Sequence, residues 1–294
     1  MAVCRLFCYD PPLVRFFPTL LAVLVFAGCA SALTARLALP DRNTLVRDQL
    51  VFHGDFPLSM HHRLFEELIA QRADVCARLA LPQSDEPIHV YLFESPERFQ
   101  DFMRLRHPGF PSRRAFFVET DTKLTIYAQW GERLADDLRH EVTHGYVHAV
   151  VPDVPLWLDE GLAKFYEVPR NRRGINLTML ERFAELRQRD GWKPNLRRME
   201  KFPNTYNMSQ DDYAEAWAWT HFLVESRPEC LELVRRYLSD VRHDAATPPI
   251  TGRLAAIHRQ PEDALMEHVD RLRSQLTSAP PAATASLLSG ALSR

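Results

Sequence analysis

The spacing of apolar and polar residues separates an α/β part, up to about residue 150, from a helical part after it. Between residues 58 and 81, apolar side chains recur at helical spacing, which predicts a long amphipathic helix that Pro82 ends. The following segments are rich in β-branched and aromatic residues. They predict a strand, a short helix and two more strands at residues 88–93, 95–103, 115–119 and 124–128.

Helical spacing dominates the rest of the chain. A helix that carries residues 140–148 is followed by a turn at Pro152 and Pro155, and then by a second helix from Trp157 to Glu167. Further helices are predicted near residues 177–190, 210–226, 228–240, 252–258 and 261–276. The fold class that follows is α+β, with a small mixed sheet and a mostly helical C-terminal subdomain.

The helix before this turn carries the segment His140-Glu141-Val142-Thr143-His144. Because an α-helix has 3.6 residues per turn, His140 and His144 project from one face and can reach a single ion. Two imidazoles and one carboxylate leave a tetrahedral Zn²⁺ one open position for a water, whose pKa the metal lowers to roughly 7. Glu141 lies beside the histidines and can take the proton of that water. These residues predict a zinc hydrolase.

The third zinc ligand is expected from the second helix, which starts after the turn and packs beside the first. Asp159 and Glu160 are adjacent but point about 100° apart around the helix axis, so only one of them faces the ion. Glu160 is the better choice, because apolar residues occupy the opposite side of this helix. Glu167 shares the Glu160 face, where it is either a hydrogen-bond partner of a ligand or a solvated carboxylate.

Histidine alternatives for the third ligand are weaker. The metzincin pattern would need glycine at position 147 and histidine at position 150, where this chain has Val147 and Val150. His148 lies two turns from His140, about 12 Å along the helix axis, which is too far for one ion to bind the whole row. We therefore expect His148 to flank the site or to support one of the ligands.

The two motif segments, Arg139 to Gly145 and Pro155 to Glu167, resemble those of the gluzincin clan of metallopeptidases. More narrowly, they resemble uncharacterised bacterial envelope lipoproteins with a peptidase-like domain of unknown function. The similarity extends to residues 113–119 and 213–221 and covers most of the chain after residue 48. It implies a zincin-like fold with Glu160 as the third zinc ligand. The exopeptidase motif of gluzincin aminopeptidases is missing, so aminopeptidase activity is not implied.

A hydrolase of this type also needs a donor for the oxyanion that forms when water adds to the carbonyl. Related gluzincins use a Tyr or His from a helix beyond the third ligand. Here Tyr213 and His221 lie two turns apart on one predicted helix, with Trp217 between them on the same face. The three can equally form an ordinary aromatic packing face. Tyr206, in the loop before this helix, is a further candidate.

The amino terminus predicts export. Basic residues precede an apolar run, residues 19–28, that is too short to span a membrane comfortably. The string Phe26-Ala27-Gly28-Cys29 resembles a bacterial lipobox, which implies a signal peptide over residues 1–29 and a lipid on Cys29. A plain signal peptide cut near Ala30 or Ala32 is the alternative. We expect a cell-envelope lipoprotein that faces the periplasm and reaches the membrane through this lipid.

The domain order predicted after the signal peptide has three parts. A polar tether covers residues 30–47, a metallopeptidase domain covers residues 48–276, and a disordered tail rich in Ala, Pro and Ser covers residues 277–294. Cys76 and Cys230 are the cysteines of the domain, and they form either a disulfide or two buried thiols.

Composition narrows the function further. The chain has 294 residues, 46% of them hydrophobic, and a net charge of −2, so it can bury a core but has no basic stripe for nucleic acid. We interpret it as a zinc-dependent, endopeptidase-like hydrolase of peptides or proteins. One alternative is a zinc-binding scaffold lipoprotein without turnover, against which Glu141 argues, and another is a hydrolase of cell-wall amide crosslinks. The oligomeric state stays open.

Overall fold

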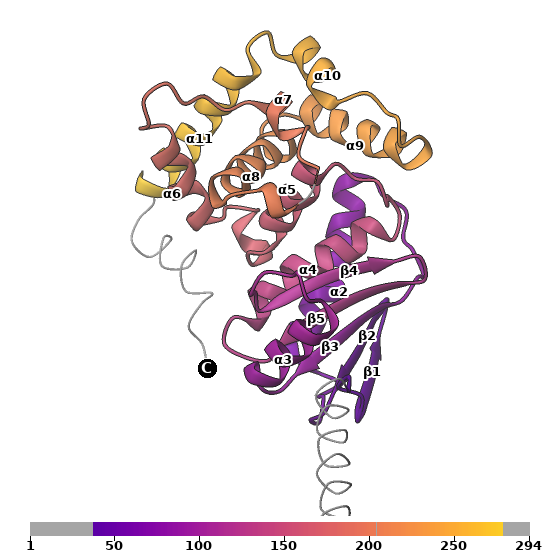
Figure 1. The fold of residues 1–294 in the computed structure, drawn as a ribbon. Coiled ribbons are helices and arrows are strands. Elements are labelled where there is room, and N and C mark those ends of the chain that lie inside the picture. Colours follow the sequence, from indigo (N-terminus) through magenta and orange to yellow (C-terminus); the bar gives the residue numbers. More distant parts are fainter. Residues whose placement is uncertain (1–37, 204, 279–294) are drawn as a thin grey trace, which may run out of the picture. The chain divides into compact units, whose positions relative to one another are not determined.

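The computed structural model describes residues 38–203 and 205–278 (Figure 1). By their Cα positions these residues divide into two compact units. The described part of the smaller unit comprises residues 38–39 and 97–112, and it contains helix α3 (Pro96–Arg106) except for the first residue of that helix. The larger unit comprises residues 40–96 and 113–278. It contains every other described element and all residues of the candidate site.

The larger unit begins with a mixed sheet whose strands follow the order β1-β2-β3-β5-β4. The strands are β1 (Asn43–Arg47), β2 (Leu50–Gly54), β3 (Ile88–Phe93), β4 (Ala115–Thr120) and β5 (Lys123–Gln129). The outer pairs, β1/β2 and β4/β5, are antiparallel, whereas β2/β3 and β3/β5 are parallel. Phe52, Val90 and Ile126 pair in register and are fully buried, because alternate side chains of each strand face the core.

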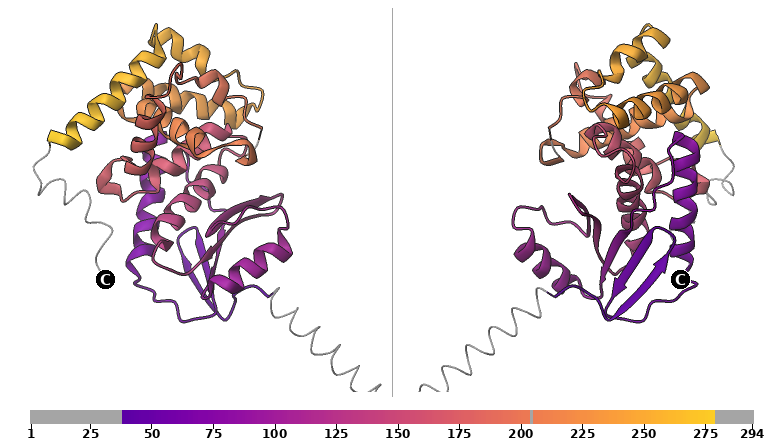
Figure 2. Two further views of the ribbon diagram at one scale, coloured as in Figure 1. Left: turned by 60° about the vertical axis from the view of Figure 1, so that its left-hand side comes forward. Right: turned by 90° about the vertical axis from the view of Figure 1, so that its right-hand side faces the viewer.

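Helices α2 (Arg63–Leu79) and α4 (Leu134–His148) pack against each other, and α4 lies across β4 and β5. The turned views in Figure 2 show α2 running along one side of the sheet. Gly145 brings α4 close to β3, because a Cβ atom at this position would lie only 2.9 Å from Ile88 Cδ1. This close approach holds the helix that carries the two predicted histidine ligands against the sheet.

The chain after α4 is helical. Its elements are α5 (Leu156–Tyr166), η1 (Arg170–Arg172), α6 (Leu177–Leu186), α7 (Leu196–Met199), η2 (Thr205–Asn207), α8 (Gln210–Glu225), α9 (Pro228–His243), α10 (Ile250–Ile257) and α11 (Pro261–Ser278). Helix α8 is central, since it packs against α5, α6, α9 and α11 and is buried without interruption from Asp212 to Val224. A capping box between Ser209 and Asp212 starts this helix.

The contact between α5 and α8 depends on Gly161. A Cβ atom on Gly161 would lie 2.6 Å from the carbonyl oxygen of Ala216, which is backbone and cannot move aside without shifting α8. Glu160 precedes this glycine on α5, and Tyr213 lies one turn before Ala216 on α8. The glycine therefore sets the separation of two helices that both carry predicted site residues.

The α+β class, the small mixed sheet and the mostly helical second part are confirmed, as are the strands predicted at 88–93, 115–119 and 124–128. The tether predicted for residues 30–47 is wrong at its end, because Asn43–Arg47 form β1 and extend the sheet. Only Leu45 of this outer strand is buried, and Val46 is 62% exposed, so the segment lacks the apolar content of a central strand. Helix α7 was not predicted.

Predictions for the two chain ends lie mainly outside the described residues. These are the signal peptide over residues 1–29, the lipid on Cys29, most of the tether and the tail beyond Ser278, to which α11 extends. No helix within residues 38–203 and 205–278 has the length and apolar character needed to cross a membrane. Cys76 and Cys230 are buried free thiols, so the disulfide alternative is wrong.

Replacing Gly161 by Ala should destabilise the protein by about 1–3 kcal/mol, because the added methyl group overpacks the contact with the α8 backbone. Urea unfolding of the metal-free protein measures this change. Gly252→Ala is the matched control, since Gly252 is a helical glycine of α10 with open space around it. That variant should gain up to about 1 kcal/mol. Equal loss of stability in both variants would contradict the role given to Gly161.

Candidate functional site

Helix α4 is fixed by polar contacts of the residues that precede its two histidines, Arg139 and Thr143. Gln71 of α2 donates from Nε2 to the Arg139 carbonyl oxygen and to Thr143 Oγ1, at 2.8 Å in both cases. The Arg139 side chain donates from Nε to the carbonyl oxygen of Glu167 at the end of α5, also at 2.8 Å. These buried contacts tie α4 to both neighbouring helices and set the direction in which His140 and His144 project.

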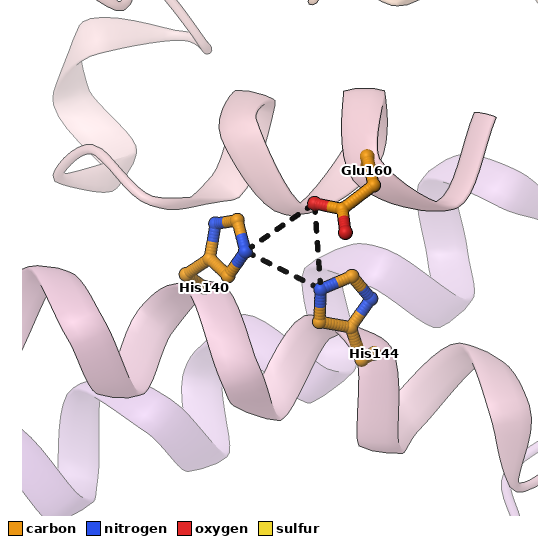
Figure 3. Close-up of side chains that lie close together, drawn as sticks. All are labelled: His140, His144 and Glu160. Atoms are coloured by element: carbon orange, nitrogen blue, oxygen red, sulfur yellow. Dashed lines mark hydrogen bonds and ion pairs between the residues drawn. The ribbon is translucent and has the colours of Figure 1, made fainter. Parts of the chain in front are cut away.

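His140, His144 and Glu160 come together between α4 and α5 (Figure 3). The two Nε2 atoms lie 3.3 Å apart, and Glu160 Oε2 lies 3.6 Å from Nε2 of His140 and 3.9 Å from Nε2 of His144. Ligand bonds of about 2.0–2.1 Å in a tetrahedral zinc site would separate ligand atoms by about 3.3 Å. The triangle of nitrogen, nitrogen and oxygen therefore has close to the dimensions of three zinc ligands.

The other ring nitrogens are engaged by carboxylates. His140 Nδ1 donates to Glu167 Oε2 (3.1 Å), and His144 Nδ1 donates to Asp159 Oδ1 (2.8 Å). In neutral imidazoles this arrangement leaves the lone pairs on the two Nε2 atoms, which face each other and Glu160 Oε2. Glu160 Oε2 is buried and accepts no hydrogen bond from the described residues. Three lone pairs that meet in a buried space fit a divalent cation.

Burial and neighbouring charges shift the pKa values of the site residues strongly. Burial, assisted by the charge of Lys164, lowers the pKa of His140 to about 3. Burial acts to lower the pKa of His144, but the carboxylates of Asp159, Glu160 and Glu141 together outweigh it and raise that pKa to about 9. Burial raises the pKa of Glu141 to about 7. In the metal-free protein, a proton and a cation therefore compete for His144 Nε2.

A second group of possible metal ligands, formed by His144, His148 and Asp159, is better explained by hydrogen bonding. Asp159 Oδ1 lies 2.8 Å from His144 Nδ1, which is a hydrogen-bond distance and shorter than the ligand spacing at a tetrahedral ion. Asp159 Oδ2 lies 3.2 Å from His148 Nε2, and His148 Nδ1 lies 2.6 Å from Glu119 Oε2 of β4. His148 thus supports a predicted ligand through Asp159, in line with the sequence-based expectation.

Glu141 faces the sheet next to the two histidines. The backbone N–H of Phe117 in β4 donates to its carboxylate, and the Phe117 ring stacks on His144 with 5.9 Å between ring centroids. Of the two strands predicted beside the site, β4 is the outer one. The carboxylate predicted as the base is therefore anchored to the strand at the edge of the sheet.

Tyr213 of α8 lies at this site. Arg113, just before β4, donates from Nη2 to Tyr213 Oη (3.0 Å), and its guanidinium carbon lies 5.8 Å from the ring centroid. Lys164 Nζ lies 5.9 Å from the same centroid, and the charges of Glu160 and Glu141 both act on the pKa of Tyr213. Neither Arg113 nor Lys164 was predicted at the site, because their positions in the sequence are no different from those of basic residues on a solvated surface.

The structure does not bring His221, the other candidate for an oxyanion donor, to this group. It lies two turns beyond Tyr213, about 12 Å along α8, where its Nδ1 shares a hydrogen bond with His268 Nε2 of α11 (2.9 Å). Trp217 packs against His221, with 5.5 Å between ring centroids, and donates from Nε1 to the Gly174 carbonyl oxygen. Tyr206 lies in η2, and its side chain is outside the described part of the chain.

A DUF1570 domain is found at residues 135–243, where the chain matches the family described as "Protein of unknown function (DUF1570)". The match runs from α4 to the end of α9, so it includes His140, Glu141, His144, Glu160 and Tyr213 but none of the five strands. No curated protein matches the chain.

We expect the apparent affinity for Zn²⁺ to rise about tenfold for each unit by which the pH increases toward 9, because below that pH the ion must displace one proton from His144. His140, with a pKa of about 3, is already neutral across this range. Chelator competition between about pH 6 and pH 8, with one equivalent of protein, measures the slope. An affinity independent of pH would contradict this picture of the site.

Asp159→Asn should reduce the number of protons released when zinc binds, because the amide no longer raises the pKa of His144. At about pH 9, where the proton competes little, the substitution should weaken zinc binding by about 10–100-fold, because His144 loses the carboxylate that orients its ring and strengthens it as a ligand. Calorimetry in buffers of different ionisation enthalpy gives both quantities. Asp153→Asn is the matched control, since Asp153 is an exposed carboxylate in the turn between α4 and α5. Equal effects of the two substitutions would show that Asp159 does not hold His144.

Proposed function

We propose that the protein is a zinc-dependent metallopeptidase of the gluzincin type, with a zincin-like catalytic domain. The observation that carries the proposal is the triangle of His140 Nε2, His144 Nε2 and Glu160 Oε2 beside a buried carboxylate, Glu141. These three atoms would hold the ion. When bound, Zn²⁺ supplies a Lewis acid and lowers the pKa of a water at its open position to about 7.

Glu141 is the residue suited to take a proton from that water. Its carboxylate is buried next to the two histidines on α4, and burial raises its pKa to about 7. A base with a pKa near the working pH can both accept a proton and pass it to the leaving amine. The Phe117 N–H holds the carboxylate in place and also opposes this increase in pKa.

Tyr213 is the residue suited to stabilise the oxyanion. Because Arg113 donates to Tyr213 Oη, the hydroxyl oxygen acts as acceptor in this contact and its own hydrogen stays available for a substrate oxygen. Arg113 and Lys164 place two positive charges around the same ring. Both charges favour the negative charge that develops on the carbonyl oxygen.

A peptide is the substrate class that best suits the edge of the sheet. Strand β4 pairs with β5 on one side only, and an extended peptide can add to the other side of such a strand by main-chain hydrogen bonds. The strand lies directly beside Glu141 through Phe117. We place the protein at the cell envelope, as a lipoprotein held by Cys29, on the strength of its amino-terminal sequence.

Glu141→Gln should lower the rate of peptide cleavage by about 10²–10⁴-fold while leaving zinc binding within a few-fold of the wild type, because the amide fills the same space but accepts no proton. Mass spectrometry of a diverse peptide mixture, with cleavage sites mapped for both proteins, measures the loss. Glu181→Gln, at an exposed position of α6, is the control for charge removal.

Four outcomes of this experiment lead to different conclusions. Stoichiometric zinc with no cleavage by the wild type would replace the peptidase with a zinc-binding envelope scaffold. Equal cleavage by Glu141→Gln would show that the cleavage does not come from the proposed site. Cleavage of cell-wall crosslinks but not of peptides would change the substrate class. A protein that binds no zinc would exclude the metal-dependent proposals altogether.

Tyr213→Phe should reduce kcat by about 10²–10³-fold with little change in KM, because the lost hydroxyl is needed only when charge develops on the carbonyl oxygen. Steady-state kinetics on a peptide found in the profiling experiment give this comparison. Tyr237→Phe, at a buried tyrosine of α9, is the matched control and should leave kcat unchanged. A rise in KM at constant kcat would instead assign Tyr213 to substrate binding.

A further inference from the structure

The smaller unit carries a segment in which basic and apolar side chains lie together at the protein surface. Residues 104–110, which we call the basic–apolar segment, read Arg-Leu-Arg-His-Pro-Gly-Phe and contain no acidic residue. Leu105 is 44% exposed and Phe110 is 38% exposed, although both are large apolar residues. Arg104 and Arg106 are exposed as well. A surface of this composition can contact a partner that is both anionic and apolar.

Helix α3 does not use Leu105 for its own packing. The buried residues of this helix, Phe99, Phe102 and Met103, follow one another at a spacing of three and one and lie on one face. Leu105 points about 120° away from Phe99 around the helix axis, and it is exposed. The apolar side chain of Leu105 is therefore available to a surface outside the protein.

The turn after α3 fixes where Phe110 lies in the basic–apolar segment. The carbonyl oxygen of His107 accepts from the backbone N–H groups of Gly109 (2.9 Å) and Phe110 (3.1 Å), and the His107 N–H donates to the carbonyl oxygen of Met103 (2.8 Å). The ring centroids of His107 and Phe110 lie 5.0 Å apart. These contacts hold the segment together as a continuation of the helix.

The chain enters the smaller unit on the Leu105 side of α3. Arg98 donates from Nη2 to the carbonyl oxygen of Ala38 at 3.0 Å, and Ala38 is the first residue that the structure describes. Arg98 and Leu105 are seven residues apart, so they lie about two turns from each other on one face of the helix. Ala38 follows Cys29 by nine positions, a length of chain that spans at most about 32 Å. A lipid on Cys29 would therefore keep this face of α3 close to a membrane.

The charge of the segment complements an anionic membrane surface. Arg104 forms an ion pair with Asp101 (3.1 Å), but its side chain stays 73% exposed, so the guanidinium can also reach an external anion. Guanidinium groups bind phosphates through charge-assisted hydrogen bonds. Anionic lipids attract an arginine near their surface about fivefold more strongly than water does. Apolar side chains beside such cations enter the boundary between headgroups and acyl chains.

We propose that the basic–apolar segment docks on the surface of the membrane that holds the lipid of Cys29. Arg104 and Arg106 contact the phosphates of anionic phospholipids, and Leu105 and Phe110 enter the apolar layer beneath them. A lipid alone limits the distance between the smaller unit and the membrane, whereas the docked segment also fixes which side of α3 faces it. This inference rests on the proposed lipidation of Cys29 and is independent of the proposed metal site.

Quenching by lipid of a dye at position 105 tests the proposal. The protein is purified with its lipid from membranes as the Leu105→Cys variant and labelled with an environment-sensitive dye, to which the buried thiols of Cys76 and Cys230 do not react. It is placed in vesicles of phosphatidylglycerol and phosphatidylcholine that contain a nitroxide-labelled lipid. We expect at least about twofold quenching, because the dye lies at the headgroup boundary. Ile257→Cys, at an exposed apolar residue of α10, is the control and should show little quenching.

Removal of the two charges tests the role of the arginines. Arg104→Gln combined with Arg106→Gln should lower the quenching at position 105 to the level of the control, because the attraction to anionic lipid falls about 25-fold. Both side chains are exposed, so the fold is retained. Arg236→Gln is the matched control, since Arg236 is an equally exposed arginine that pairs with Glu232 on its own helix, and it should leave the quenching unchanged. Equal quenching in the double variant and in Arg236→Gln would overturn the proposal.

Mass analysis of the purified chain separates failure of the docking from failure of its premise. A chain without lipid on Cys29 would overturn both this proposal and the envelope anchoring. A lipidated chain that is quenched equally at positions 105 and 257 would overturn the docking alone. A dye at position 105 that is shielded in intact envelopes but not quenched in vesicles would identify a protein as the partner and would overturn docking on lipid. Zinc binding and peptide cleavage are measured separately and do not depend on these outcomes.

Discussion

Four carboxylates and two imidazoles meet in the buried space between α4 and α5, and the surrounding structure compensates for placing these charges there. An unpaired carboxylate in such a place costs several kcal/mol. Glu167 is satisfied by His140 and Lys164, and Asp159 by His144 and His148. Glu160 is the exception, because its inward oxygen has no protein donor among the described residues. A cation shared with the two Nε2 atoms, as we propose, would complete the arrangement.

The fold supports this space from three directions. Gln71 and Arg139 bind α4 to the neighbouring helices by hydrogen bonds. Gly161, which has no side chain, lets α5 pack closely on α8. The backbone N–H of Phe117 binds Glu141 to the sheet. Each contact is made by backbone or by a buried polar side chain, so its geometry is well defined. The site residues therefore project from regular elements and not from loops, which is the arrangement that holds ligands most precisely.

The sequence predicted the residues of the candidate site better than it predicted their surroundings. His140, His144 and Glu160 could be found because helical spacing alone puts two imidazoles on one face and one carboxylate on the next helix. The same reasoning made His221 a candidate, because helical spacing puts it on the same face of α8 as Tyr213. Only the tertiary packing shows that His221, two turns further along α8, contacts His268 of α11 instead. Arg113 was missed because its partner, Tyr213, lies a hundred positions away.

The three atoms that would hold the ion come from positions 140, 144 and 160, on two consecutive helices joined by one short turn. An ion bound there would join only these two neighbouring helices and would close a loop of about twenty residues. The sheet and the later helices would have no direct bond to it. The entropy that such a closure removes from the unfolded chain corresponds to about 3 kcal/mol, somewhat less than for an ion that joins distant parts of a chain. The contacts of Gln71, Arg139 and Gly161 position α4 and α5 without the ion, so a bound metal would add stability to ligands that these contacts already hold in place.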